Sequence, residues 1–310
     1  MTPPQEPEDI APGWSIEPES ESTTPDGQRI SPRGNGMDFL KDASRGPRLQ
    51  KVLAAAGIAS RRACEVLIEE GAVRVNGMQV KGLPAWVNPS EDSITVHGQR
   101  VRTGAPSVCV MLYKPRGIVC TSADPEDRKR AVDLVQHPKK VRLFTIGRLD
   151  MDSSGMLLLT NDGELSNLIS HPSNHVHRVY DITVNGEVDS AMVWRLERGI
   201  NLPEEHTGRP RVARFESVRI IRSQRDRTKM RVVLTEGRNR QIRRMMMALG
   251  HPVRKLRRVA IGPLKLTDLR PGQWRDLTER EVKQLRDAAA KRSKRKRHIQ
   301  RRPKNTQEER

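Results

Sequence analysis

Cysteines and long apolar runs are both scarce in this chain of 310 residues. The three cysteines, Cys64, Cys109 and Cys120, are odd in number and lack the CxxC spacing that is typical of zinc sites. They are therefore predicted to be reduced thiols of a cytoplasmic protein, without a disulfide framework or a structural metal. No apolar run reaches about 18 residues, which excludes a membrane-spanning helix. The acidic, proline-rich N-terminus is unlike a signal peptide.

Apolar residues make up only 35% of the chain and charged residues 31%, so part of it is expected to be unfolded. The net charge of +19 indicates a polyanionic partner, of which nucleic acid is the commonest. Residues 1–46 nevertheless contain nine acidic and four basic residues, together with seven prolines. We expect a disordered acidic arm over 1–46, and a disordered basic tail over 285–310 that contacts RNA phosphates.

The pattern between residues 47 and 106 predicts a compact unit of two short helices followed by a hairpin. Apolar side chains recur at helical spacing from Leu49 to Ala56, and Ser60 is expected to cap a second helix. Val73–Val75 alternates in polarity, and Asn76-Gly77 then supplies a tight hairpin turn. The basic residues of this unit are expected to lie near one another: Arg48, Lys51, Arg61, Arg62 and Arg74.

The second pattern, over residues 107–284, consists mostly of strands. Strands are predicted at Val108–Tyr113, Val179–Val184, Val212–Ile221 and Met230–Thr235, and a helix at Arg240–Leu249. Strands and helices do not alternate over long stretches, which makes a doubly wound parallel sheet a poor fit. The fold class expected is α+β, with a mixed, largely antiparallel sheet.

The segment RLQKVLAAAGIASRRACEVLIEEGAVRVNGMQV resembles the S4 RNA-binding domain over roughly residues 47–95. Helix lengths, the SRR cap and the VNG turn all agree with that family. The resemblance implies binding of structured RNA through the basic face of the helix pair. The alternative is a helical hairpin with a merely solvated basic face, but several cations on a rigid surface would give a salt-dependent grip on RNA.

Four later blocks resemble the RsuA/RluB group of ribosomal RNA pseudouridine synthases over about residues 107–280. The blocks are YKPRGIVCT, FTIGRLDMDSSGMLLLTNDGELSNLISHP, HRVYDITVNGEV and LTEGRNRQIRRMMMALGHPVRKLRRVAIGPLKL. The resemblance implies conversion of uridine to pseudouridine, closest to the large-subunit branch, with neither cofactor nor metal. The group usually has Thr at Ser153 and another residue at Tyr113; Ser153 keeps the hydroxyl, and Tyr113 lies outside the catalytic run.

Asp150, in the run GRLD, is the catalytic carboxylate that the resemblance implies. It follows the apolar segment Phe144–Ile146 and precedes another apolar run, so it is expected to lose hydration and to need a nearby cation. The resemblance implies that Arg243 is this cation and pairs with Asp150. From the residues alone, Asp150 could instead be a turn former.

Tyr180 matches the active-site tyrosine of the group, whose ring stacks on the target base. The alternating run around it would equally allow an ordinary half-buried strand aromatic. Arg148 lies two residues before Asp150 and is expected to hold the RNA backbone where the base leaves the stack. Arg238 and Arg240 are expected either to contact phosphates or to order the loop before the helix.

Other functions fit the sequence less well than an enzyme does. A non-catalytic S4-domain RNA-binding or ribosome-assembly factor would explain the charge, but it has no physical need to retain Asp150, Tyr180 and Arg243 together. A metal-dependent nuclease would need clustered ligands, and the spacing of His171, His175 and His177 suits no common metal site. The expected partner is ribosomal RNA or a ribosome-assembly intermediate, bound by a monomer.

Overall fold

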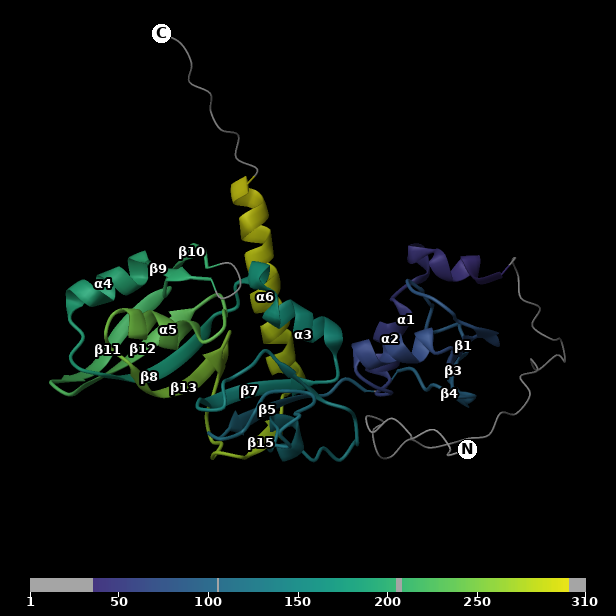
Figure 1. The fold of residues 1–310 in the computed structure, drawn as a ribbon, viewed down its shortest axis with the longest axis horizontal. Coiled ribbons are helices and arrows are strands. Elements are labelled where there is room, and N and C mark those ends of the chain that lie inside the picture. Colours follow the sequence, from purple (N-terminus) through teal and green to yellow (C-terminus); the bar gives the residue numbers. More distant parts are fainter. Residues whose placement is uncertain (1–35, 105, 205–207, 301–310) are drawn as a thin grey trace, which may run out of the picture. The chain divides into compact units, whose positions relative to one another are not determined.

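The computed structural model describes residues 36–104, 106–204 and 208–300, and side chains within residues 39–290 of these ranges (Figure 1). The chain divides into two compact units. The first extends to Ser107 and includes His137–Arg142, and the second comprises Val108–Gln136 and the chain from Leu143 onward. The first border lies next to the predicted one at residue 106. The assignment of His137–Arg142 to the first unit was not predicted.

The first unit has the predicted helix pair and hairpin. Ser60 caps the second helix, since its hydroxyl accepts a hydrogen bond from Ala63 N at 3.1 Å. The antiparallel sheet has the order β2-β1-β3-β4. The elements are α1 (Leu49–Ala55), α2 (Arg61–Glu69), β1 (Val73–Val75), β2 (Met78–Gln79), β3 (Ile94–Val96) and β4 (Gln99–Arg100).

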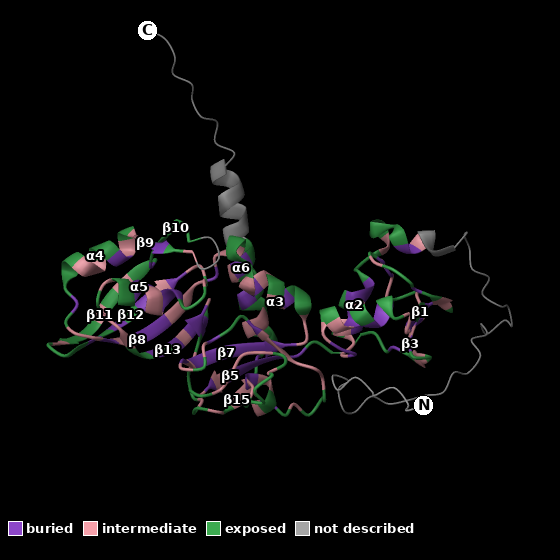
Figure 2. Cartoon of the chain, viewed as in Figure 1, coloured by how far each residue is buried: buried purple, intermediate pink, exposed green. Residues whose placement is uncertain are grey.

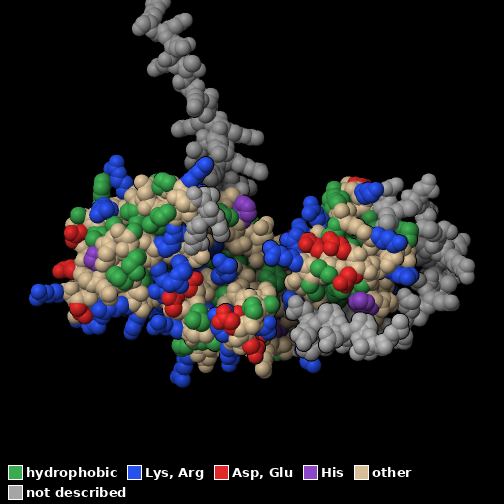
Figure 3. Space-filling model, viewed as in Figure 1, with side chains coloured by type: hydrophobic (Ala, Val, Ile, Leu, Met, Phe, Trp, Pro, Cys, Tyr) green, Lys and Arg blue, Asp and Glu red, His purple; other side chains and the backbone are tan. Residues whose placement is uncertain are grey.

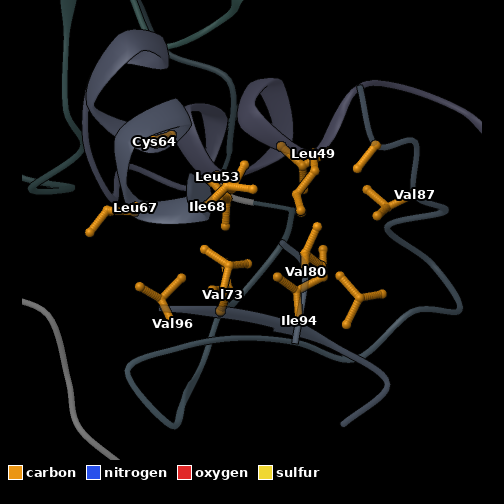
Figure 4. Close-up of a cluster of buried hydrophobic side chains, with 14 of the residues drawn as sticks. Leu49, Leu53, Cys64, Leu67, Ile68, Val73, Val80, Val87, Ile94 and Val96 are labelled. Atoms are coloured by element: carbon orange, nitrogen blue, oxygen red, sulfur yellow. The ribbon is translucent and has the colours of Figure 1, made fainter. Parts of the chain in front are cut away.

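Apolar side chains from both helices pack on one face of this sheet (Figure 4). Leu53 and Ile68 from the helices meet Val73, Ile94 and Val96 from the strands, and all five are buried. Burial of this cluster removes the apolar stripe of each helix from water, which is what holds such short elements together. The prediction of two short helices followed by a hairpin is confirmed.

The segment before α1 corrects the prediction of a disordered arm over 1–46. Two short 3₁₀ helices, η1 (Gly36–Lys41) and η2 (Ala43–Arg45), lie there. The Leu40 side chain is only 2% exposed, and its carbonyl accepts a hydrogen bond from Trp86 N at 2.8 Å. Arg45 Nη2 forms an ion pair with Asp92 and donates to both of its carboxylate oxygens. One apolar anchor and one ion pair order this segment, and neither produces a periodic pattern. Residues 1–35 lie outside the described part of the chain.

The second unit contains a nine-stranded sheet with the order β11-β12-β8-β13-β7-β5-β15, to which β14 adds beside β13 and β6 beside β7. The pair β13 and β7 is parallel, and the other pairs are antiparallel, so the expected mixed, largely antiparallel sheet is confirmed. Its strands are β5 (Cys109–Lys114), β6 (Phe144–Ile146), β7 (Ser154–Thr160), β8 (Arg178–Asn185), β11 (Ser217–Gln224), β12 (Arg227–Leu234), β13 (Val253–Ile261), β14 (Leu264–Lys265) and β15 (Trp274–Asp276).

Helices cover this sheet through two separate apolar clusters (Figure 2). One cluster joins α4 and α5 to β8 and β12, and the other joins α3 and α6 to β5 and β7. None of the helices within the described residues is long and apolar enough to cross a membrane. The helices are η3 (Ala131–Leu134), α3 (Gly163–Ser170), η4 (Pro172–Asn174), α4 (Ser190–Arg198), α5 (Gln241–Ala248) and α6 (Glu279–Gln300).

Two boundary predictions in the second unit are wrong. The predicted strand Val212–Ile221 is two strands, because the buried Phe215 turns the chain from the small sheet of β9 (Ile200–Pro203) and β10 (Pro210–Ala213) into β11. The predicted tail from residue 285 begins inside α6, where Leu285 and Ala289 are fully buried. Apolar residues at helical spacing thus continue into the basic segment. Residues 301–310 lie outside the described chain.

Two of the three thiols are buried in different cores. Burial raises the pKa of Cys64 to about 11 and that of Cys109 to about 12. Both thiols therefore stay protonated near neutral pH, and a protonated, buried thiol behaves as a small apolar side chain. This environment fits the predicted reduced cysteines.

Gly155 permits the parallel contact between β7 and β13. Its φ is +111°, and a Cβ placed on it would lie 2.2 Å from the carbonyl oxygen and 2.6 Å from the nitrogen of Arg258. Both atoms belong to the backbone, so they cannot move away as a flexible side chain would. Only glycine fits where these two strands meet.

We predict that Gly155→Ala lowers the free energy of unfolding by about 4 kcal/mol or more, because it combines strain in φ with a backbone clash. Gly272→Ala is the matched control, since Gly272 has φ of +88° but open space around its Cβ position. It should lose only about 1–2 kcal/mol. Chemical denaturation of both variants measures the difference. Equal losses would show that the close strand contact contributes nothing.

Candidate active site

One pocket of the second unit gathers every site residue that the sequence predicted there. It forms between the loop after β6, strands β8 and β13, and the start of α5. Residues separated by nearly a hundred positions are thereby brought together, as the predicted site requires. The predicted residues in its lining are Arg148, Asp150, Tyr180, Arg238, Arg240 and Arg243.

Asp150 begins a tight turn in which Ser153 N donates a hydrogen bond to the Asp150 carbonyl at 3.0 Å. Its side chain is half-buried, at 34% exposure, and therefore less desolvated than expected. Arg240 Nη1 lies 3.5 Å from Asp150 Oδ2. A carboxylate and a cation thus lie side by side in the lining of the pocket.

The predicted ion pair between Arg243 and Asp150 is wrong in this structure. Arg243 Nη2 instead lies 3.0 Å from Asp152 Oδ1 and donates to the Ser153 hydroxyl at 3.3 Å. Arg243 also donates to the Val253 carbonyl at 3.0 Å, which fixes the guanidinium between α5 and β13. Two aspartates separated by one residue occupy the same turn, so sequence spacing could not decide which of them faces the arginine.

Asp152 and the two arginines form a charge network around the turn. Burial alone would raise the pKa of Asp152, but Arg243 and Arg240 outweigh it and hold this pKa below its ordinary value. Burial lowers the pKa of Arg243, while Asp152 and Asp150 oppose that shift. Ser153, where the group has Thr, is buried and keeps a hydroxyl in this network.

Tyr180 lies on β8 in the wall of the pocket. Its side chain is buried, and the register places it opposite Val232 of β12 and Arg258 of β13. Leu149 and Ile242 belong to the same apolar cluster. The ring is therefore fixed by packing while its residue lines the pocket, a placement that suits a stacking surface.

Two buried cations, which sequence reasoning missed, hold the main chain around Asp150. Lys114, at the end of β5, is fully buried, and its Nζ donates to the carbonyls of Pro115, Asp150 and Ser153 at 2.9–3.1 Å. Burial lowers the pKa of Lys114, whereas Asp150 and Asp152 oppose the shift. The signal in the sequence is a lysine that ends an otherwise apolar strand.

Arg258 of β13 holds the other side of the same loop. It is 2% exposed and donates from Nε to the Met156 carbonyl at 2.7 Å and from Nη1 to the Arg148 carbonyl at 3.3 Å. Its Nη2 is buried without a hydrogen-bond partner among the described residues, and Arg258 lines the pocket. A buried donor of this kind is costly unless a ligand satisfies it.

Several other predicted residues have structural contacts. Arg238 donates to the Val212 carbonyl and pairs with Glu236, both at 3.0 Å, which orders the loop before α5. The ring of His171 caps η4 by accepting from Ser173 N. These contacts agree with the loop-ordering alternative for Arg238 and with a structural role for His171.

The five basic residues predicted for the first unit are all exposed. Arg48 lies 5.7 Å from the ring centroid of Trp86. Arg61 and Arg62 occupy the first two positions of α2, where the helix dipole disfavours cations by about 0.3–1 kcal/mol each. An anion bound at the start of α2 would offset this unfavourable interaction between the cations and the helix dipole.

The chain belongs to the RNA pseudouridylate synthase family. That family matches residues 108–248, and the S4 domain matches residues 47–81. The pocket described above lies largely within the first of these ranges. The family assignment confirms the predicted class, an isomerase with an S4 RNA-binding domain.

Curated relatives carry names that agree with this class. "Ribosomal large subunit pseudouridine synthase B" of Bacillus subtilis is 43% identical over 242 residues, covering 78% of this chain and 96% of that protein. The protein of the same name from Shigella flexneri is 39% identical and covers 77% of this chain and 82% of that protein. A solved pseudouridylate synthase matches with a TM-score of 0.53 at 28% identity, over 77% of this chain and 99% of that one.

We predict that Lys114→Met destabilises the protein by about 2–4 kcal/mol and slows turnover, because three carbonyls lose the buried donor that they share. The side-chain stem stays apolar and similar in size, so packing is largely kept. Lys283→Met, at an exposed position of α6, is the control and should change stability by less than about 0.5 kcal/mol. Denaturation and tritium release from RNA labelled at uracil C5 measure the two effects. A fully stable and active Lys114 variant would show that these hydrogen bonds do not hold the loop of Asp150 in place.

Proposed function

We propose that this chain isomerises specific uridines of large-subunit ribosomal RNA to pseudouridine. The observation that carries the proposal is the convergence of Asp150, Tyr180 and Arg243 on one pocket of a pseudouridine synthase fold. The names of the relatives from Bacillus subtilis and Shigella flexneri support the large ribosomal subunit as the source of the substrate.

The reaction needs no redox step and keeps the base in the site. The N1–C1′ bond breaks, the uracil turns, and a C5–C1′ bond forms; C5 then loses its proton while N1 takes one up. A duplex hides these atoms, so the nucleotide must leave the stack and enter a pocket. The protein must therefore supply a carboxylate near C1′, a surface for the base and donors for its oxygens.

In this proposal the Asp150 carboxylate acts at C1′, and the Tyr180 ring stacks on the base. Arg258 Nη2, buried without a partner among the described residues, donates to an oxygen of the uracil. Arg148 is exposed at the pocket and holds the RNA where the base has left. Arg243 positions the turn through Asp152 and Ser153, so it acts on Asp150 indirectly.

The S4 unit supplies affinity, since its exposed cations face solvent and it carries no candidate catalytic group. Such contacts are electrostatic, depend on salt, and read shape more than sequence. Arg240, which is exposed at the pocket, would add a phosphate contact at its rim, while Arg238 orders the loop before α5. The enzyme is proposed to act as a monomer in the cytoplasm, where its thiols would stay reduced.

We predict that Asp150→Asn abolishes isomerisation, with a loss of about 10⁴-fold or more, while folding and RNA affinity stay close to wild type. The change preserves size and removes only the charge that the chemistry uses. Tritium release from C5-labelled ribosomal RNA, a thermal melt and a binding assay measure the three properties.

Asp152→Asn is the matched control, because it removes the same charge from the same turn. It should retain measurable turnover, since Asp152 acts through Arg243 and not on the base. Should Asp150→Asn turn over well while Asp152→Asn is inactive, the catalytic role would pass to Asp152.

We also predict that Arg61→Gln with Arg62→Gln flattens the plot of log affinity against log salt by about 1.5 units, at roughly 0.7–0.9 per lost phosphate contact. The single-turnover rate at saturating RNA should not change, because these residues contribute binding only. Lys81→Gln with Lys140→Gln, at two exposed lysines of the same unit, should leave the slope nearly unchanged. A slower chemical step at saturation, with affinity intact, would show that the S4 unit helps build the active site.

A further inference from the structure

One face of the sheet in the second unit is open and strongly basic. Strands β11, β12, β8 and β13 alternate, so that Met230, Val232 and Ile182 point into the apolar cluster under α4 and α5. The intervening positions point the other way and are mostly exposed. We call this surface the basic sheet face; its charged members are Arg219, Arg222, Arg227, Lys229, Arg231, Lys255, Arg257 and Asp181.

The charges lie in rows that cross the strands. Register pairs Arg219 with Arg231, Arg231 with Asp181, and Asp181 with Arg257. A second row runs through Arg222 and Lys229 to Lys255. Neighbouring strands are about 4.8 Å apart, so each row crosses four strands over about 14 Å. Figure 3 shows basic side chains projecting along the border of the molecule below β11, β8 and β13.

Asp181 is the one carboxylate among these positions, and it forms ion pairs with only two of the cations, Arg231 and Arg257. It is 8% exposed and pairs with Arg231 at 2.7 Å and with Arg257 at 3.3 Å. Burial alone would raise its pKa, but the two arginines outweigh it and hold this pKa below its ordinary value. The side chains of Arg219, Arg222, Lys229 and Lys255 have no hydrogen-bond or ion-pair partner within the described residues.

The cations of this face that lack an ion pair do not stabilise the fold. Like charges directly opposite one another across strands are destabilising, and the pairs Arg219–Arg231 and Arg222–Lys229 are of this kind. A dense field of one sign on a flat surface attracts a polyanion. The charged residues that define this face are arginines, lysines and one aspartate, without an aromatic residue among them, so the surface suits a sugar–phosphate backbone more than splayed nucleotides.

We propose that the basic sheet face is a second RNA-binding surface, which holds the backbone of a helix belonging to the same ribosomal RNA substrate. The inference rests on the proposed function for the identity of that RNA. The pocket-lining residues Tyr180, Leu234 and Leu256 belong to the covered side of the same strands, so the two RNA contacts lie on opposite faces of the sheet. A folded RNA with several helices can reach both faces, whereas a short stem-loop can reach only one.

The test compares a face variant, with Gln at Arg219, Arg222, Lys229 and Lys255, with a control variant. The control carries Gln at Arg214, Lys265, Arg280 and Lys283, which are exposed in the same unit. These substitutions remove the same number of positive charges as those of the face variant. Binding to a large-subunit ribosomal RNA transcript and to a short RNA stem-loop is measured over a series of salt concentrations. A third variant exchanges Arg and Lys at the four face positions and thus keeps the charge.

On the long transcript, the face variant should flatten the salt dependence by about 2–3.5 units, and the control by less than about 0.9. The charge-preserving variant should keep the wild-type slope, and no variant should differ on the stem-loop. Melting of the face variant should be unchanged or higher, since it loses like-charge pairs. Equal slopes for face and control variants would overturn the proposal and leave an acidic protein segment as the occupant. Tritium release by the wild type tests the proposed function separately.

Discussion

Two buried cations hold the main chain on which the candidate active site is built. Lys114 and Arg258 are almost fully buried, and both donate to backbone carbonyls of the segment from Arg148 to Met156. Burying a charge is costly unless polar groups solvate it, and here carbonyl oxygens take the place of water. The same contacts fix the turn that presents Asp150. Stability of this loop and placement of the Asp150 carboxylate therefore depend on the same hydrogen bonds.

The parallel contact between β7 and β13 makes this clamp possible. Gly155 allows the two backbones to approach, and the register then places Arg258 opposite Gly155 on one side and Tyr180 on the other. Lys114 reaches the same point from β5, where it also pairs with Gly155. One glycine thus brings both cations, the turn and the tyrosine into one neighbourhood, which explains why the site lies at the junction between the two halves of the sheet.

Sequence reasoning succeeded where a signal is local or carried by a motif. The Ser60 cap and the hairpin at Asn76 follow from short-range chemistry, and the resemblance brought together residues that the pocket then gathered. It failed where contacts between distant segments determine the local structure or the partner of a side chain. Leu40 orders its segment as a single anchor, Phe215 breaks a continuous strand pattern, and the partner of Arg243 depends on the shape of a turn. Lys114 was missed because a lone lysine carries no periodicity that reveals burial.

Alternation along the strands gives the sheet two different surfaces. On β8, Tyr180 faces the pocket while Asp181 faces the basic sheet face, and on β13 the neighbours Arg258 and Arg257 divide in the same way. The two adjacent arginines thus have different environments: Arg258 is buried and holds the loop that carries Asp150, and Arg257 is half-exposed in a charged row. A slip of one residue in register would exchange them, placing an exposed cation in the core and a buried one in solvent. The register shift between Arg258 and Ala260 lies directly after this pair, where the strand passes from the pocket to the second apolar cluster. Correct pairing of β13 with β8 is therefore required for the clamp and for the charged face alike.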